Sequence, residues 1–130
     1  MTPGAAERDM AVDERQLCEH IEETADDLSQ TVSRLVAAKS VTGAEAPAQD
    51  VVIKEFEALG TDPDVWEPSA DKLSDHPGYF STSSYEEYGY EGRPNVAAIK
   101  SGTGDGRSLG FSGHIDVVDV EPSSWSHQPW

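Results

Sequence analysis

Cysteine and basic residues are scarce in this 130-residue chain, and long apolar runs are missing from it. The single cysteine, Cys18, excludes an internal disulfide and fits a reducing compartment. Residues 1–16 are polar, which argues against a secretory signal peptide. No stretch approaches the roughly 18 consecutive apolar residues that a membrane helix needs. We therefore expect a cytoplasmic protein without a membrane partner.

The balance of charge is strongly acidic, with 25 Asp and Glu against 9 Lys and Arg and a formal net charge of -16. Such a chain repels nucleic-acid phosphates and anionic lipid, so we expect no nucleic-acid partner. The acids are spread along the sequence, a style typical of proteins adapted to high salt (halophilic), although an ordinary acidic protein is the alternative. The mean hydropathy of -0.55 is low. Periodic apolar segments argue against disorder for most of the chain.

The first half of the chain reads as helices followed by a strand. Residues 1–11 have the composition of a disordered start, and residues 13–39 have helical periodicity. A second helix is predicted over 46–59, ended by Gly60, and a short strand over 63–67. The apolar residues of the first helix fall on one stripe: Leu17, Ile21, Leu28, Val32, Leu35 and Val36.

The second half is less regular. Residues 68–93 predict a long ordered loop packed by its own aromatic side chains. Strands are predicted over 95–100 and 108–114, as a hairpin or as neighbours in one sheet. The glycine-rich link at 101–106 lacks the lysine and hydroxyl residues of a phosphate-binding loop, so it reads as a turn.

The residues with the clearest chemical potential are His114 and Asp116. On a strand, positions i and i+2 project to the same side, so the imidazole and the carboxylate would lie together. A neutral imidazole is a good zinc ligand, and a nearby carboxylate orients it through the other ring nitrogen. Asp116 could alternatively bind the metal itself. From spacing alone, a structural His–Asp hydrogen bond is the more usual interpretation of such a pair.

The wider string Ser112–Val118 resembles the metal-site segment of the M20 family of metallopeptidases, which includes acetylornithine deacetylase, succinyl-diaminopimelate desuccinylase and carboxypeptidase G. Ser40–Gly43 after the first helix is similar to the opening of that family, and Phe56–Gly60 to the end of its second helix. Tyr90–Val96 is similar to the strand entry of the deacetylase branch. The chain differs at Asp119, where a proline is common, and at Trp130, where phenylalanine is.

This resemblance implies an α/β fold, with residues 12–130 forming the amino-terminal part of a truncated mixed-sheet catalytic domain. It implies that His114 is a ligand of one of two zinc ions, with cobalt as a substitute, and that Asp116 is the catalytic residue that orients it. The implied substrates are N-acyl amino acids or small peptides, hydrolysed at the amide bond, and the implied parent is a homodimer.

The other ligands and the general base of the family have no counterpart in this sequence. We therefore expect the 130-residue chain alone to be inactive, because one histidine and one carboxylate cannot hold a two-metal site. The alternative is a non-catalytic interaction or structural half-protein that retains the start of the fold.

Overall fold

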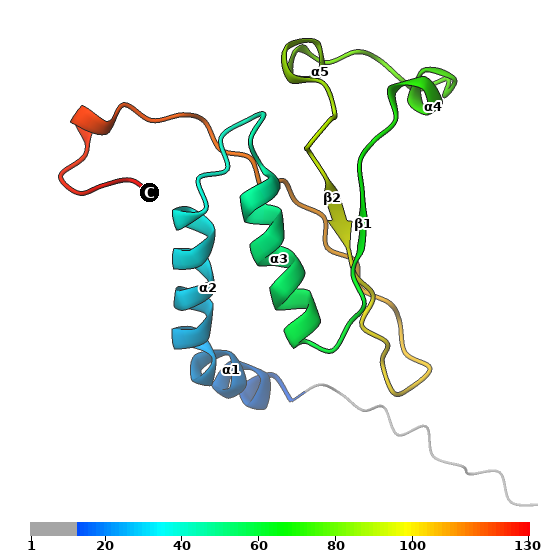
Figure 1. Ribbon diagram of the computed structural model, residues 1–130. Coiled ribbons are helices and arrows are strands. Elements are labelled where there is room, and N and C mark those ends of the chain that lie inside the picture. Colours follow the sequence, from blue (N-terminus) through cyan, green and yellow to red (C-terminus); the bar gives the residue numbers. More distant parts are fainter. Residues whose placement is uncertain (1–12) are drawn as a thin grey trace, which may run out of the picture. The chain divides into compact units, whose positions relative to one another are not determined.

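A computed structural model describes residues 13–130 of the chain (Figure 1). The chain divides into two compact units. The first unit ends at Val32 and the second runs from Ser33 to Trp130. The predicted disordered start at 1–11 lies outside the described residues. Helices and one small antiparallel sheet make up the regular structure: α1 (Glu14–Glu23), α2 (Ala25–Ala37), α3 (Ala46–Ala58), β1 (Asp64–Trp66), α4 (Ala70–Ser74), α5 (Ser83–Tyr88), β2 (Asn95–Ala97) and a 3-10 turn (Pro122–Ser124).

The predicted single helix over 13–39 is two helices, α1 and α2, that meet at Thr24. The Asp13 side chain accepts hydrogen bonds from two backbone N–H groups in the first turn and so begins α1. At Thr24 the hydroxyl donates to the carbonyl of Ile21 at 3.0 Å. The Thr24 carbonyl then accepts the first bond of the next helix, from the N–H of Leu28. A threonine side chain that bonds to the preceding turn competes with the helical ladder, which explains the break.

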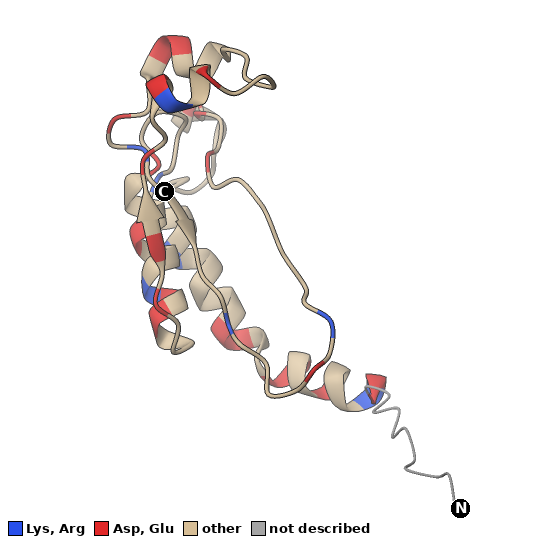
Figure 2. Ribbon diagram, turned by 90° about the vertical axis from the view of Figure 1, so that its right-hand side faces the viewer, with Lys and Arg blue, Asp and Glu red and all other residues tan. Residues whose placement is uncertain are grey.

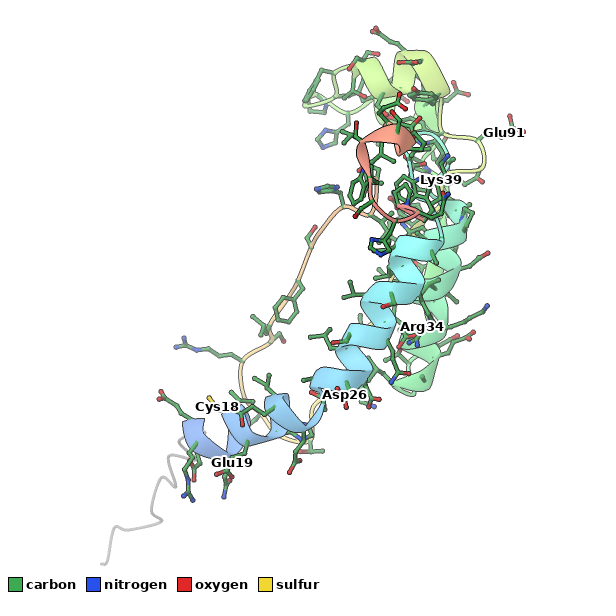
Figure 3. The ribbon with its side chains drawn as sticks, turned by 90° about the vertical axis from the view of Figure 1, so that its left-hand side faces the viewer. Cys18, Glu19, Asp26, Arg34, Lys39 and Glu91 are labelled. Carbon is green, nitrogen blue, oxygen red and sulfur yellow. The ribbon has the colours of Figure 1, made fainter. Side chains whose placement is uncertain are left out.

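The apolar stripe predicted for the first helix forms but faces solvent. Neither α1 nor α2 has a buried residue, and Cys18 of α1 is exposed as well (Figure 3). Of the stripe residues, all except the half-buried Leu35 are exposed: Leu17, Ile21, Leu28, Val32 and Val36.

Helix α3 confirms the predicted helix over 46–59 with an end one residue earlier. Pro47 lies in its first turn, where a missing N–H costs no intrahelical bond. Gly60 takes a φ of 73° just after the helix, and its N–H donates to the carbonyl of Glu57 at 2.8 Å. Ala48 of this helix is the only hydrophobic residue among positions 13–130 that is fully buried.

Strands β1 and β2 pair antiparallel, with Val65 opposite Val96. The predicted strands over 63–67 and 95–100 are confirmed, although β2 is shorter than expected. The predicted strand over 108–114 is wrong, and so is its hairpin with 95–100, since that segment has no strand structure and Phe111 is 91% exposed. A strand is stable only where a second backbone completes its hydrogen bonds, and the backbone of 108–114 makes no such bond to another described segment.

The stretch over 68–93, predicted as a loop, contains the two short helices α4 and α5. Each begins at a hydroxyl residue whose side chain accepts a backbone N–H, Ser69 for α4 and Thr82 for α5. The predicted packing of aromatic side chains is confirmed in part, because the Tyr85 and Tyr90 rings stack with centroids 4.4 Å apart. The stretch is therefore an ordered connection that joins β1 to β2.

Asp and Glu residues are distributed over the helices and loops of the described part of the chain (Figure 2). This distribution matches the expectation of a solvated acidic surface, in which separation and salt weaken the repulsion between like charges. No helix within residues 13–130 combines the length and the apolar character needed to cross a membrane.

Candidate functional site

The segment after α2 pairs with the segment that contains the predicted site residues. Val41 and Val117 form an isolated parallel bridge. The N–H of Val117 donates to the carbonyl of Ser40 at 2.9 Å, and the N–H of Thr42 donates to the carbonyl of Val117 at 3.2 Å. The Ser40 hydroxyl adds a bond of 2.7 Å to the carbonyl of Ile115. These bonds fix the backbone around the histidine and the aspartate against the start of the fold's second unit.

His114 and Asp116 contact each other, as their spacing predicts. Nδ1 of His114 lies 3.1 Å from Oδ1 of Asp116 and 3.0 Å from the Asp116 backbone carbonyl. Both partners are acceptors when the carboxylate is ionised, so the ring proton belongs on Nδ1. Nε2 then presents its lone pair, and within residues 13–130 it has no hydrogen-bond partner. The His114 side chain is 85% exposed, which leaves Nε2 open to a ligand.

The second carboxylate oxygen of Asp116 is also engaged. Oδ2 accepts a hydrogen bond of 2.9 Å from the hydroxyl of Thr42. With one oxygen facing His114 and the other facing Thr42, the geometry favours the orienting role for Asp116 over direct metal binding. The sequence interpretation missed Thr42, for which the only local signal is a hydroxyl in the turn that follows a helix.

Beside this pair lies a nearly buried ion pair between Glu45 and Arg93. Nη2 of Arg93 is 2.7 Å from Oε1 of Glu45, and Nε is 2.9 Å from Oε2, so the contact is bidentate. The N–H of Gly43 adds a bond of 2.8 Å to Oε1. Burial alone raises the pKa of Glu45, but the hydrogen bonds from Arg93 and Gly43 outweigh it and leave that pKa below its usual value.

The same bond to Glu45 raises the pKa of Arg93 against the opposing effect of burial, and the negative charge of Asp116 contributes to the rise. The guanidinium also donates to the carbonyl of Gly89 and the hydroxyl of Ser84. Arg93 therefore lends positive charge to the neighbourhood of Asp116, while its own hydrogen bonds go to other groups.

Two cavities adjoin the His114–Asp116 pair. The larger, of about 340 Å³, is lined by polar and aromatic side chains that include Tyr85, Tyr90 and Arg93. The smaller, of about 260 Å³, has apolar lining residues that include Leu35 and Val36 of α2, Val117 and Trp130. His114 and Asp116 line both cavities, so the exposed imidazole is within reach of a small molecule on either side.

As a metal site, the arrangement offers one free ligand. No group of three or more His, Cys, Asp or Glu side chains suited to a metal ion occurs in the described part of the chain. The His20 ring lies 3.9 Å from the Glu23 carboxylate, and the His76 ring accepts a hydrogen bond from the N–H of Gly78. One imidazole nitrogen with an orienting carboxylate behind it fits half of a zinc centre and falls short of a complete one.

Comparison with known proteins gave no match to any protein family, curated protein or solved structure. The resemblance of Ser112–Val118 to the M20 metallopeptidases therefore depends on the sequence motif. The geometry around His114 and Asp116 is independent of that motif, since it follows from the hydrogen bonds of the structure.

Proposed function

We propose that this chain supplies half of the zinc centre of an amidohydrolase, with His114 as the ligand through Nε2 and Asp116 as the carboxylate that orients it. The observation that carries the proposal is the 3.1 Å contact between His114 Nδ1 and Asp116 Oδ1, which leaves Nε2 open. A carboxylate on the far nitrogen of an imidazole is the usual arrangement behind a zinc-binding histidine. The M20-like string Ser112–Val118 supports the same two roles.

The proposed substrates are N-acyl amino acids or small peptides, hydrolysed at the amide bond. Zinc, or cobalt in its place, would polarise the amide carbonyl and activate a water when bound. The cavity of about 340 Å³ beside His114 is of a size that suits such a small molecule. The remaining ligands and the general base would come from polypeptide outside residues 13–130, within an intact α/β hydrolase that we propose to be a homodimer.

Metal binding can be tested on the 130-residue chain by adding Co²⁺ and recording NMR spectra of its histidine rings. We expect paramagnetic broadening at His114 at the lowest Co²⁺ concentrations, with weak affinity because one ligand is available. His114→Gln should remove this broadening, whereas the matched control His127→Gln should leave it in place. Broadening confined to other histidines or to the acidic helices would refute the assignment of His114.

Catalysis needs a separate assay, with N-acetyl amino acids as substrates and Zn²⁺ or Co²⁺ in the buffer. The chain alone should show no turnover, because the described residues offer no group of three or more side chains that could hold the metal ion. Metal-dependent turnover that His114→Gln abolishes would show that the ligand set is more complete than we propose.

A second candidate function is a non-catalytic interaction half-protein. The observation that favours it is the exposure of three large apolar side chains, Ile99, Leu109 and Phe111, which are 79–91% exposed. If this function is correct, Phe111→Asp should reduce association of the chain in light scattering, and His114→Gln should have no effect on it. If instead Co²⁺ binding depends on His114, the result favours the hydrolase over the interaction half-protein.

A further inference from the structure

We propose that Thr42 is a positioning residue, whose hydroxyl fixes the Asp116 carboxylate and thereby holds the His114 ring with Nε2 outward. The inference rests on the proposed function, because it assigns Thr42 a task in that same half-site. Thr42 lies 74 positions before Asp116 in the sequence and contacts neither the free nitrogen nor either cavity. Its effect on a ligand must therefore pass through Asp116.

The first argument is the freedom of the carboxylate. The terminal torsion of an aspartate is broad, so one hydrogen bond does not define the plane of its two oxygens. Here Oδ1 lies 3.1 Å from His114 Nδ1 and Oδ2 lies 2.9 Å from the Thr42 hydroxyl. Two anchors on opposite oxygens fix the plane. Without the hydroxyl, Asp116 can rotate about its last bond and turn Oδ1 away from the ring.

The second argument is the rigidity of the anchor. Thr42 is β-branched, which limits its side-chain rotamers. Its N–H is bonded to the carbonyl of Val117, the residue directly after Asp116. The hydroxyl and the carboxylate are thus held by the same parallel bridge, at Val41 and Val117, and their separation is set by the backbone.

The third argument is the lack of a substitute among the described residues. Arg93 is the cation that acts electrostatically on Asp116, but its donors are directed at Glu45, Ser84 and Gly89. Apart from His114 itself, Thr42 makes the one hydrogen bond to the Asp116 side chain within residues 13–130. If the Thr42 hydroxyl is removed and the carboxylate turns away, the Asp116 backbone carbonyl is the acceptor that remains for the His114 Nδ1–H group.

The test is the tautomer of His114 in the ¹⁵N-labelled, metal-free chain, read from long-range ¹H–¹⁵N spectra at a pH where the ring is neutral. The wild type should carry its proton on Nδ1. In Thr42→Val, which keeps the β-branch, the ratio of Nε2–H to Nδ1–H forms should rise about threefold to tenfold, the equivalent of one net hydrogen bond. Thr42→Ser restores a hydroxyl without the β-branch, so it should return the ratio most of the way to the wild-type value.

Ser40→Ala is the matched control, because it removes a side-chain bond from the same segment, to the carbonyl of Ile115, without touching the carboxylate. An unchanged ratio in Thr42→Val, or an equal rise in Ser40→Ala, would overturn the positioning role. Co²⁺ broadening at His114, recorded separately, tests the hydrolase. If the tautomer shifts as expected but Co²⁺ does not bind His114, the proposed function fails while the Thr42–Asp116–His114 relation holds.

Discussion

The Arg93 guanidinium binds the Glu45 carboxylate through two hydrogen bonds, of 2.7 and 2.9 Å, where both side chains are largely withdrawn from solvent. The pair joins the start of α3 to the entry of β2, 48 positions apart in the sequence. The Gly43 N–H bonds to the same carboxylate, which ties the pair to the turn that carries Thr42. The ion pair therefore connects the turn at Gly43, the start of α3 and the entry of β2, which lie next to the candidate site.

We predict that Arg93→Met destabilises the chain by about 2–3 kcal/mol, because it leaves a desolvated carboxylate without its main partner. The free energy of unfolding in urea measures this loss. The control is Arg15→Met, which removes an exposed pair with Glu19, at 3.8 Å, and should leave the unfolding free energy unchanged within error. Equal losses in the two variants would contradict the structural role assigned to Arg93.

The pH dependence of stability should contain a contribution from Glu45. Its pKa is lower in the folded chain than the ordinary value of 4.5, so the folded state favours the ionised form. Such a group stabilises the fold above the unfolded pKa, and this stabilisation is lost as the pH falls through the folded pKa. The unfolding free energy of the wild type should therefore fall relative to that of Glu45→Gln below about pH 4.5.

The comparison with Glu45→Gln is essential because the other carboxylates act in the opposite direction. Protonating them reduces the self-repulsion of a chain with a net charge of -16, which by itself stabilises the fold at low pH. If the difference between wild type and Glu45→Gln does not change with pH, the assignment for Glu45 is wrong.

Gly43→Ala should destabilise the chain more than a glycine substitution elsewhere. Gly43 has a φ of +94°, and a Cβ there would lie 2.5 Å from Cδ1 of the Tyr88 ring. We expect a loss of about 2–3 kcal/mol from strain and overlap, measured by urea unfolding. Gly92→Ala also introduces a Cβ at a positive φ, of +71°, but meets no atom within 4 Å, so it should cost about 1 kcal/mol. If Tyr88→Ala removes the overlap, Gly43→Ala should cost less unfolding free energy in a Tyr88→Ala background than in the wild type. An equal cost in both backgrounds would contradict the overlap.

Salt should stabilise the chain. Raising NaCl from 0.1 to 1 M shortens the Debye length from about 10 to about 3 Å and weakens repulsion among the exposed carboxylates. We expect a gain of about 1 kcal/mol, or roughly 4 °C in the melting temperature. KCl at the same ionic strength should act equally. A gain seen only with sulfate would point instead to exclusion of that salt from the surface.

Local patterns predicted the parts of the fold that local interactions decide. Helix α3 followed from its apolar spacing with Pro47 and Gly60 at its ends. The break at Thr24 was missed because it depends on one hydroxyl that bonds to the preceding turn. The strand predicted at 108–114 failed because a strand depends on a partner backbone, which periodicity does not specify.

In the candidate site, too, the contacts that are local in sequence could be predicted and the long-range contacts could not. His114 and Asp116 are two positions apart, so their contact could be predicted from spacing. Thr42 and the Glu45–Arg93 pair meet their partners across 74 and 48 positions, and the sequence carries no local signal for either. The contact between His114 and Asp116 was therefore predictable, whereas the groups that hold these two side chains in place were not.

The isolation of Ala48 as the one fully buried hydrophobic residue of the described chain has a consequence for backbone amide exchange. Slow exchange with deuterium requires hydrogen bonds that open only when packed structure opens. Protection should then concentrate in α3 and in the Val117 and Thr42 amides of the parallel bridge. The amides of 101–111, which are exposed throughout, should exchange at nearly the rate of an unstructured peptide.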